Sequence, residues 1–150
     1  MAAKGTRIRC PEDICGVVGS WARRREENFL AVTLNGAHEV IRVHHVTKGL
    51  VNRTIVHPRE CFLPAVKDYA SSVAFVHNHP SGNLSPSGDD ERLTDRLCMA
   101  GSILGFNVVD HVIIGPRGGL FSFRREGAMR EGFSQEERKE FFDYLAAEGK

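Results

Sequence analysis

The feature that most restricts the fold is the succession of two short apolar runs and a long amphipathic segment in the second half of the chain. Residues 73–77 form a short run typical of a buried strand, and residues 107–114 form another. Between them, residues 87–104 predict a helix, whose apolar stripe consists of Leu93, Leu97, Ala100 and Leu104. Strands and helices therefore intermix, which predicts an α/β fold with a mixed β-sheet flanked by helices.

The other segments predict further elements of the same fold. A short helix is expected at 11–24, and a β-hairpin of strands 29–34 and 38–47 turns at Asn35-Gly36. A helix is expected at 58–70, with Pro64 in its first turn or kinking it. A last short strand at 120–123 precedes a C-terminal helix at about 133–148, which opens with a capping-box pattern at 134–137.

Composition narrows the class of protein. With 150 residues, 41% of them hydrophobic, the chain is long enough for one domain with its own core. The net charge of +1 gives no general reason to expect binding to nucleic acid or to a membrane. No secretory signal opens the chain and no apolar run could span a bilayer. The four cysteines form no Cys-x-x-Cys pair, and free thiols of this kind favour the cytoplasm.

Two histidines at the end of the first apolar run predict a metal site. On an extended segment, His77 and His79 point to the same side. A third ligand can come from Asp90, because Ser87 is well placed as the N-cap and Asp90 then falls in the first helical turn. Asp89 competes with Asp90 by position. The ordinary alternative is a strand end followed by a turn and a capped helix, which needs no metal.

Two histidines and one carboxylate would leave a fourth tetrahedral position open, as in catalytic zinc sites. Zinc lowers the pKa of the water that it binds to about 7, which makes that water a nucleophile. Hydrolysis also needs a base for the proton and a donor for the oxyanion. The Ser87 hydroxyl is a candidate donor, whereas spacing alone does not identify the base.

These residues together resemble a known family. His77-Asn-His79, seven residues, Ser87, two residues and Asp90 reproduce the His-x-His-x7-Ser-x2-Asp pattern of the JAMM (MPN+) zinc metallopeptidases. The closer resemblance is to the RadC branch and covers roughly residues 26–127. The segments that carry it are His77-Asn-His-Pro-Ser-Gly82, Pro86-Ser87, Val56-His-Pro-Arg-Glu60, Asp110-His-Val-Ile-Ile-Gly115 and Ser122-Phe-Arg-Arg-Glu-Gly127.

The resemblance implies a JAB/MPN fold, a three-layer sandwich like that of cytidine deaminases, and a Zn²⁺-dependent hydrolase of peptidase or isopeptidase type. It also implies a glutamate base two residues before a phenylalanine at the start of an early strand. That residue is Glu27 here, and the adjacent Glu26 is its rival. The expected organisation is one domain, with a short N-terminal helical arm at 1–25, the metallopeptidase core at 26–127 and a C-terminal helix at 128–150. The last helix is a candidate for homodimer formation.

Two other functions compete with the hydrolase. RadC-like proteins carry a historical DNA-repair label, which would make nucleic acid a partner, but the near-zero charge and the lack of aromatic-basic interleaving argue against direct binding. A non-catalytic binding module is the other alternative, although such modules typically lose metal ligands. The signature of zinc deaminases is absent. Asp110 and His111 could orient the metal ligands or simply line the core.

Overall fold

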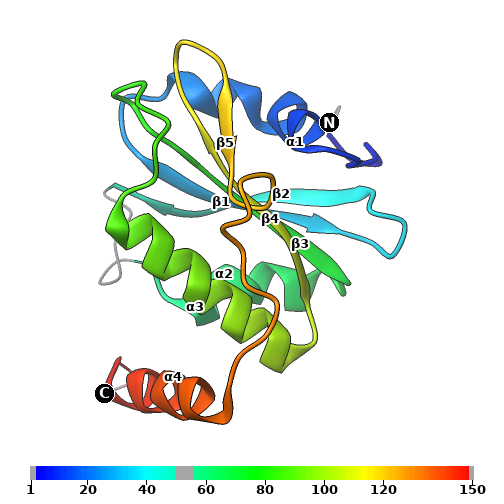
Figure 1. Cartoon of the computed structure of the whole chain (residues 1–150). Coiled ribbons are helices and arrows are strands. Elements are labelled where there is room, and N and C mark those ends of the chain that lie inside the picture. Colours follow the sequence, from blue (N-terminus) through cyan, green and yellow to red (C-terminus); the bar gives the residue numbers. More distant parts are fainter. Residues whose placement is uncertain (1–2, 50–55, 149–150) are drawn as a thin grey trace.

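A five-stranded β-sheet forms the centre of the molecule (Figure 1). The computed structural model describes residues 3–49 and 56–148. The strands lie in the order β2-β1-β3-β4-β5, and among these neighbours only β3 and β4 run parallel. The mixed sheet predicted from the sequence is therefore confirmed. The strand bounds are β1 Asn28–Leu34, β2 Val40–Lys48, β3 Ser72–Asn78, β4 Asn107–Ile114 and β5 Leu120–Ser122.

Helices cover both faces of this sheet (Figure 1). Helix α1 and the short 3-10 helix η1 lie on one face, and α2 and α3 lie on the other. Helix α4 lies outside this second layer and contacts α3. This gives the three layers expected of the α/β sandwich. The helix bounds are α1 Pro11–Val18, η1 Gly19–Arg23, α2 Pro58–Lys67, α3 Gly88–Leu104 and α4 Gln135–Glu148.

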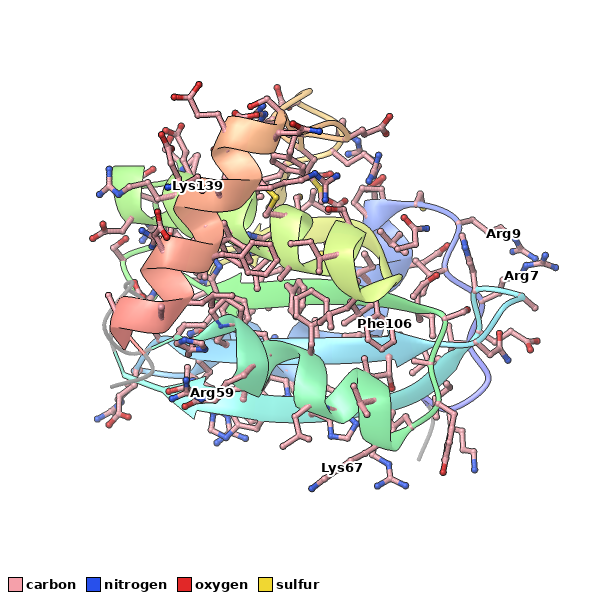
Figure 2. All side chains as sticks on the ribbon, turned by 90° about the horizontal axis from the view of Figure 1, so that it is seen from below. Arg7, Arg9, Arg59, Lys67, Phe106 and Lys139 are labelled. Carbon is pink, nitrogen blue, oxygen red and sulfur yellow. The ribbon has the colours of Figure 1, made fainter. Side chains whose placement is uncertain are left out.

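Of the three inner strands, β1 and β3 are buried along their whole length. Helices on both faces explain this, because each strand then directs alternate side chains into two separate cores. Phe29 and Phe75 belong to the core under α2 and α3, while Leu30 and Val76 belong to the core under α1. Figure 2 shows the side chains packed between the sheet and helices α2, α3 and α4, with Phe106 between α2 and α3.

Some element boundaries differ from the prediction. The helix expected at 11–24 is α-helical only as far as Val18 and continues as η1. Helix α2 ends at Lys67, and Pro64 lies in its interior and not in its first turn, so it cannot donate a hydrogen bond to the carbonyl four residues before it.

The predicted apolar stripe of α3 is wrong at its last member. Leu93, Leu97 and Ala100 are buried, but Leu104 is 56% exposed. The close contact between α3 and β4 in this turn is made instead by Gly101, where an added Cβ would lie 2.7 Å from Val108. The left-handed Gly105 then ends the helix and returns the chain to β4.

The described helices include none that is both long and apolar enough to cross a membrane.

Candidate metal centre

The two histidines and the aspartate singled out in the sequence meet at one end of the sheet. His77 is the last residue but one of β3, and His79 follows the end of that strand. Asp90 lies in the first turn of α3, which the loop at 79–87 brings back over the strand end. His77 and Asp90 are buried and His79 is half-buried, so this group is sheltered but not sealed.

The ligand atoms of these residues lie at distances that suit one metal ion. His77 Nε2 is 3.0 Å from His79 Nε2, and His79 Nε2 is 3.2 Å from Asp90 Oδ2. His77 Nε2 is 3.3 Å from Asp90 Oδ1. Tetrahedral zinc with bonds of about 2.0–2.1 Å places its ligand atoms about 3.3 Å apart. The cluster could therefore hold a metal ion, with three protein ligands and a further position left for water or substrate.

Asp90, and not its competitor Asp89, joins the cluster. The Ser87 hydroxyl accepts from the Asp90 amide, and the Asp90 carboxylate accepts from the Ser87 amide at 2.9 Å, which makes a full capping box. Burial raises the pKa of Asp90, but the hydrogen bonds to His77 and His79 outweigh burial and hold it well below its usual range. Asp89 instead pairs with Arg92 at the surface.

The loop between His79 and Asp90 is shaped by its own polar groups. His79 Nδ1 donates to the carbonyl of Asn83 at 2.7 Å, which leaves Nε2 as the atom that faces the cluster. The Ser85 amide donates to the Asn83 side chain, and the Gly82 amide donates to the carbonyl of His79. The same hydrogen bonds therefore form the turns of the loop and orient the His79 ring toward the cluster.

Glu27 lies just before β1 on the side of the sheet that carries His77. Phe29 pairs with His77 in the antiparallel register of β1 and β3, and on the β2 side the carbonyl of Glu27 accepts from the Gly49 amide at 2.7 Å. On this extended segment Glu27 shares the face of Phe29. The pKa of His79 is raised, chiefly by its hydrogen bond to Asp90, and the negative charge of Glu27 contributes. Glu27 is half-buried, whereas its rival Glu26 is exposed.

Asn78, between the two histidines, holds the segment that carries Glu27. Its side chain points to the opposite face of the sheet, accepts from the Asn28 amide at 2.7 Å and donates to the Glu26 carbonyl at 3.0 Å. A longer bond of 3.3 Å reaches the carbonyl of Arg24. The sequence analysis missed this contribution, although an asparagine on a buried strand requires hydrogen-bond partners and could have signalled it.

A third histidine, which is not a member of the cluster, lies behind His77. His111 on β4 is fully buried, its Nε2 lies 2.8 Å from His77 Nδ1, and its Nδ1 lies 2.6 Å from the hydroxyl of Thr94. Of the two residues that could orient the ligands or line the core, His111 contacts a ligand and Asp110 does not, because Asp110 faces α1 and binds Ser122. Thr94 was not singled out from the sequence.

The remaining histidines on the neighbouring elements have other partners. His44 and His45 point to opposite faces of β2, as expected, where His44 binds Asp68 and His45 packs on Trp21. His57 caps the start of α2 by accepting from the Arg59 amide.

The fold and the cluster define an α/β protein with a candidate metal site made by two strand-end histidines and an aspartate from a helix N-terminus. The chain belongs to the family of RadC-like JAB domains, whose model matches residues 8–128. This match includes α1, which the resemblance over residues 26–127 had left out.

Similar proteins occur in several prokaryotes. A UPF0758 protein from Desulforamulus reducens is 48% identical over 109 residues, which are 72% of this chain and 48% of the relative. One from Trichlorobacter lovleyi is 49% identical over 105 residues, 70% of this chain and 45% of the relative. One from Rubrobacter xylanophilus is 42% identical over 123 residues, 81% and 53% of the two chains. The chain thus spans about half the length of the curated relatives it matches.

Proposed function

We propose that this protein is a zinc-dependent hydrolase of peptidase or isopeptidase type. The observation that carries the proposal is the convergence of His77, His79 and Asp90, whose three ligand atoms lie 3.0–3.3 Å apart. The set has the nitrogen and oxygen donors that zinc prefers and keeps a position open. Membership of the RadC-like JAB family adds to the case.

The side chains around the cluster suit the steps of amide hydrolysis. Zinc held there would act as a Lewis acid that activates water and polarises the substrate carbonyl. Glu27 would accept the proton of the attacking water and deliver it to the nitrogen that leaves. Ser87 would donate its hydroxyl hydrogen to the oxyanion of the tetrahedral intermediate. The cap bond uses the Ser87 oxygen only as an acceptor, so it leaves the hydroxyl hydrogen for this purpose.

The proposed partners follow from the reaction. The substrate is a peptide, an isopeptide or another amide, and the chain acts in the cytoplasm as a homodimer. All four cysteines are unpaired, which suits a reducing compartment. Phe142 on α4 is 54% exposed and gives this helix an apolar side chain for self-association.

We also propose a single domain whose core spans 26–127, extended by an arm at 1–25 and a C-terminal helix at 128–150. Both extensions pack on the core: α1 contacts β4 and β5, and α4 contacts α3.

Metal content is the first test. Elemental mass spectrometry of the purified protein should find about one zinc per chain, the stoichiometry of a mononuclear site. His79→Ala and Asp90→Ala should lose it, whereas Asp89→Ala, the neighbouring carboxylate, should keep it. If the native protein holds no zinc and takes up none when zinc is added, the hydrolase is refuted and a binding module becomes the better description.

Hydrolysis of a panel of peptide and isopeptide substrates is the second test. Glu27→Gln should lower kcat by about 10²–10⁴-fold, the range for loss of a general base, while its zinc content stays native. Glu26→Gln is the matched control and should remain active. A loss of activity in Glu26→Gln alone would transfer the role of base to Glu26.

A further inference from the structure

A chain of buried hydrogen bonds connects one candidate ligand to another through two side chains outside the cluster. Thr94 Oγ1 lies 2.8 Å from the carbonyl of Asp90 and 2.6 Å from His111 Nδ1. His111 Nε2 lies 2.8 Å from His77 Nδ1. The four residues come from α3, β4 and β3, and each is at most 2% exposed. Water therefore has little access to any member of this chain.

The donor and acceptor of each of these hydrogen bonds follow from the first bond, between Thr94 and the Asp90 carbonyl. A backbone carbonyl can only accept, so the Thr94 hydroxyl spends its one hydrogen on Asp90. The hydroxyl must then accept from His111, which places a hydrogen on His111 Nδ1. The ring of His111 is fully buried and hydrogen-bonds to a hydroxyl and an imidazole, neither of which offsets a buried positive charge, so this ring is neutral and its Nε2 is an acceptor. His77 must therefore donate from Nδ1.

In His79 a single hydrogen bond, to the carbonyl of Asn83, likewise places a hydrogen on Nδ1. Both rings consequently carry a hydrogen on Nδ1, and their Nε2 atoms face each other and Asp90. The two nitrogens and the Asp90 carboxylate lie so close together that they need a cation among them, a proton in the metal-free protein or a metal ion in its place. The hydrogen bonds on the outer side of the two rings thus direct both Nε2 atoms into the cluster, where a metal ion would bind.

We propose that Thr94 and His111 are positioning residues that hold His77 as the Nδ1–H tautomer, with its Nε2 lone pair directed into the cluster. This inference goes beyond the ligand set and, in its consequence for zinc affinity, rests on the proposed function. This series of hydrogen bonds begins at Asp90 and ends at His77. It therefore also joins the helix that supplies one ligand to the strand that supplies another.

Removing the Thr94 hydroxyl should reverse the direction of the hydrogen bond between His111 and His77. In Thr94→Val the Nδ1–H of His111 would be buried without an acceptor, and moving the hydrogen to Nε2 relieves this. His111 would then donate to His77 Nδ1, and His77 would carry its hydrogen on Nε2, where it blocks the ligand position. Thr94→Ser keeps the hydroxyl and is the matched control. His111→Phe interrupts the chain one step later and preserves the stacking on Phe123.

The decisive measurement is ¹⁵N–¹H correlation NMR of the histidine rings in metal-free protein, with ring signals assigned from single histidine variants. The native protein and Thr94→Ser should show a protonated Nδ1 and an unprotonated Nε2 in His77. Thr94→Val should show the reverse. A protonated Nε2 in native His77, or the same tautomer in Thr94→Val and native protein, would overturn the proposal.

Zinc affinity, measured by competition with a chromogenic chelator, gives the second readout. Thr94→Val and His111→Phe should bind zinc about 10–100-fold more weakly than native protein, the range for loss of an outer-shell partner. Thr94→Ser should stay near native, and native affinity in both Thr94→Val and His111→Phe would contradict the consequence. If the native protein binds no zinc, the proposed function fails, while the tautomers of the metal-free protein still decide the role of Thr94 and His111.

Discussion

Asn78→Ala should destabilise the protein without emptying the metal site. The Asn78 side chain is 1% exposed and makes hydrogen bonds to the Asn28 amide and to the carbonyls of Glu26 and Arg24. At about 0.5–1.5 kcal/mol each, three such bonds amount to about 1.5–4.5 kcal/mol. The Glu26 carbonyl keeps a second donor, the Asn28 side chain, so we expect a loss of about 2–4 kcal/mol.

The assay is urea unfolding, supported by thermal unfolding. For a chain of this size the loss corresponds to a fall in Tm of roughly 5–15 °C. Asn28→Ala is the matched control, because its side chain gives up a single bond, to Glu26, and should lose only about 0.5–1.5 kcal/mol. Zinc content should be native in both variants, since the Asn78 side chain lies on the face of β3 opposite to His77.

The reasoning is refuted if Asn78→Ala loses no more stability than Asn28→Ala. In that case other contacts would hold the segment before β1. Loss of zinc from a folded Asn78→Ala protein would be equally damaging, because it would mean that the two faces of β3 are not independent.

Three further predictions concern stability. Gly101→Ala should lose about 1–3 kcal/mol by overpacking against Val108, whereas Gly16→Ala, at an open helical position, should be neutral or gain up to about 1 kcal/mol; thermal unfolding separates them. Burial raises the pKa of Asp68, but hydrogen bonds from His44 and a threonine outweigh it and lower this pKa. Ionised Asp68 therefore stabilises the fold fully above the unfolded pKa of about 3.9, and urea unfolding should show its advantage over Asp68→Asn vanishing as the pH falls below that value. Chelation should lower the Tm of zinc-loaded protein, because metal at 100 times its Kd adds about 2.7 kcal/mol, and it should leave a ligand variant unchanged.

Local sequence rules were sufficient for the parts of the candidate site that lie within one element. The period of two along a strand places His77 and His79 on one side, and the N-cap rule places Asp90 in the first turn behind Ser87. The structure brings these residues together as those rules require. The capping box of α4 was equally local and is present at Ser134 and Glu137.

Local rules could not predict which residue of β4 lies behind the ligands, because that placement depends on the register between β3 and β4. In β3 and β4, Val73 pairs with Val108 but Ala74 pairs with Asp110, so a bulge at this point adds one residue to β4. Without that residue Phe75 would pair with Asp110 instead of His111, and the side chains of β4 would exchange faces. The sequence alone therefore does not show which of Asp110 and His111 faces the ligands.

The bulge thus decides which chemistry lies behind His77. With it, a neutral imidazole meets His77 Nδ1 and passes the hydrogen bond on to Thr94, while the Asp110 carboxylate is sent to the α1 face to bind Ser122 and the turn after β5. A carboxylate in that place would draw the Nδ1 hydrogen more strongly and make the ligand more basic, as in carboxylate–histidine–zinc triads. The imidazole instead fixes the tautomer without adding charge. The cluster of ligands accordingly contains one buried carboxylate, Asp90, and a bound dication would retain a net positive charge with which to polarise a substrate carbonyl.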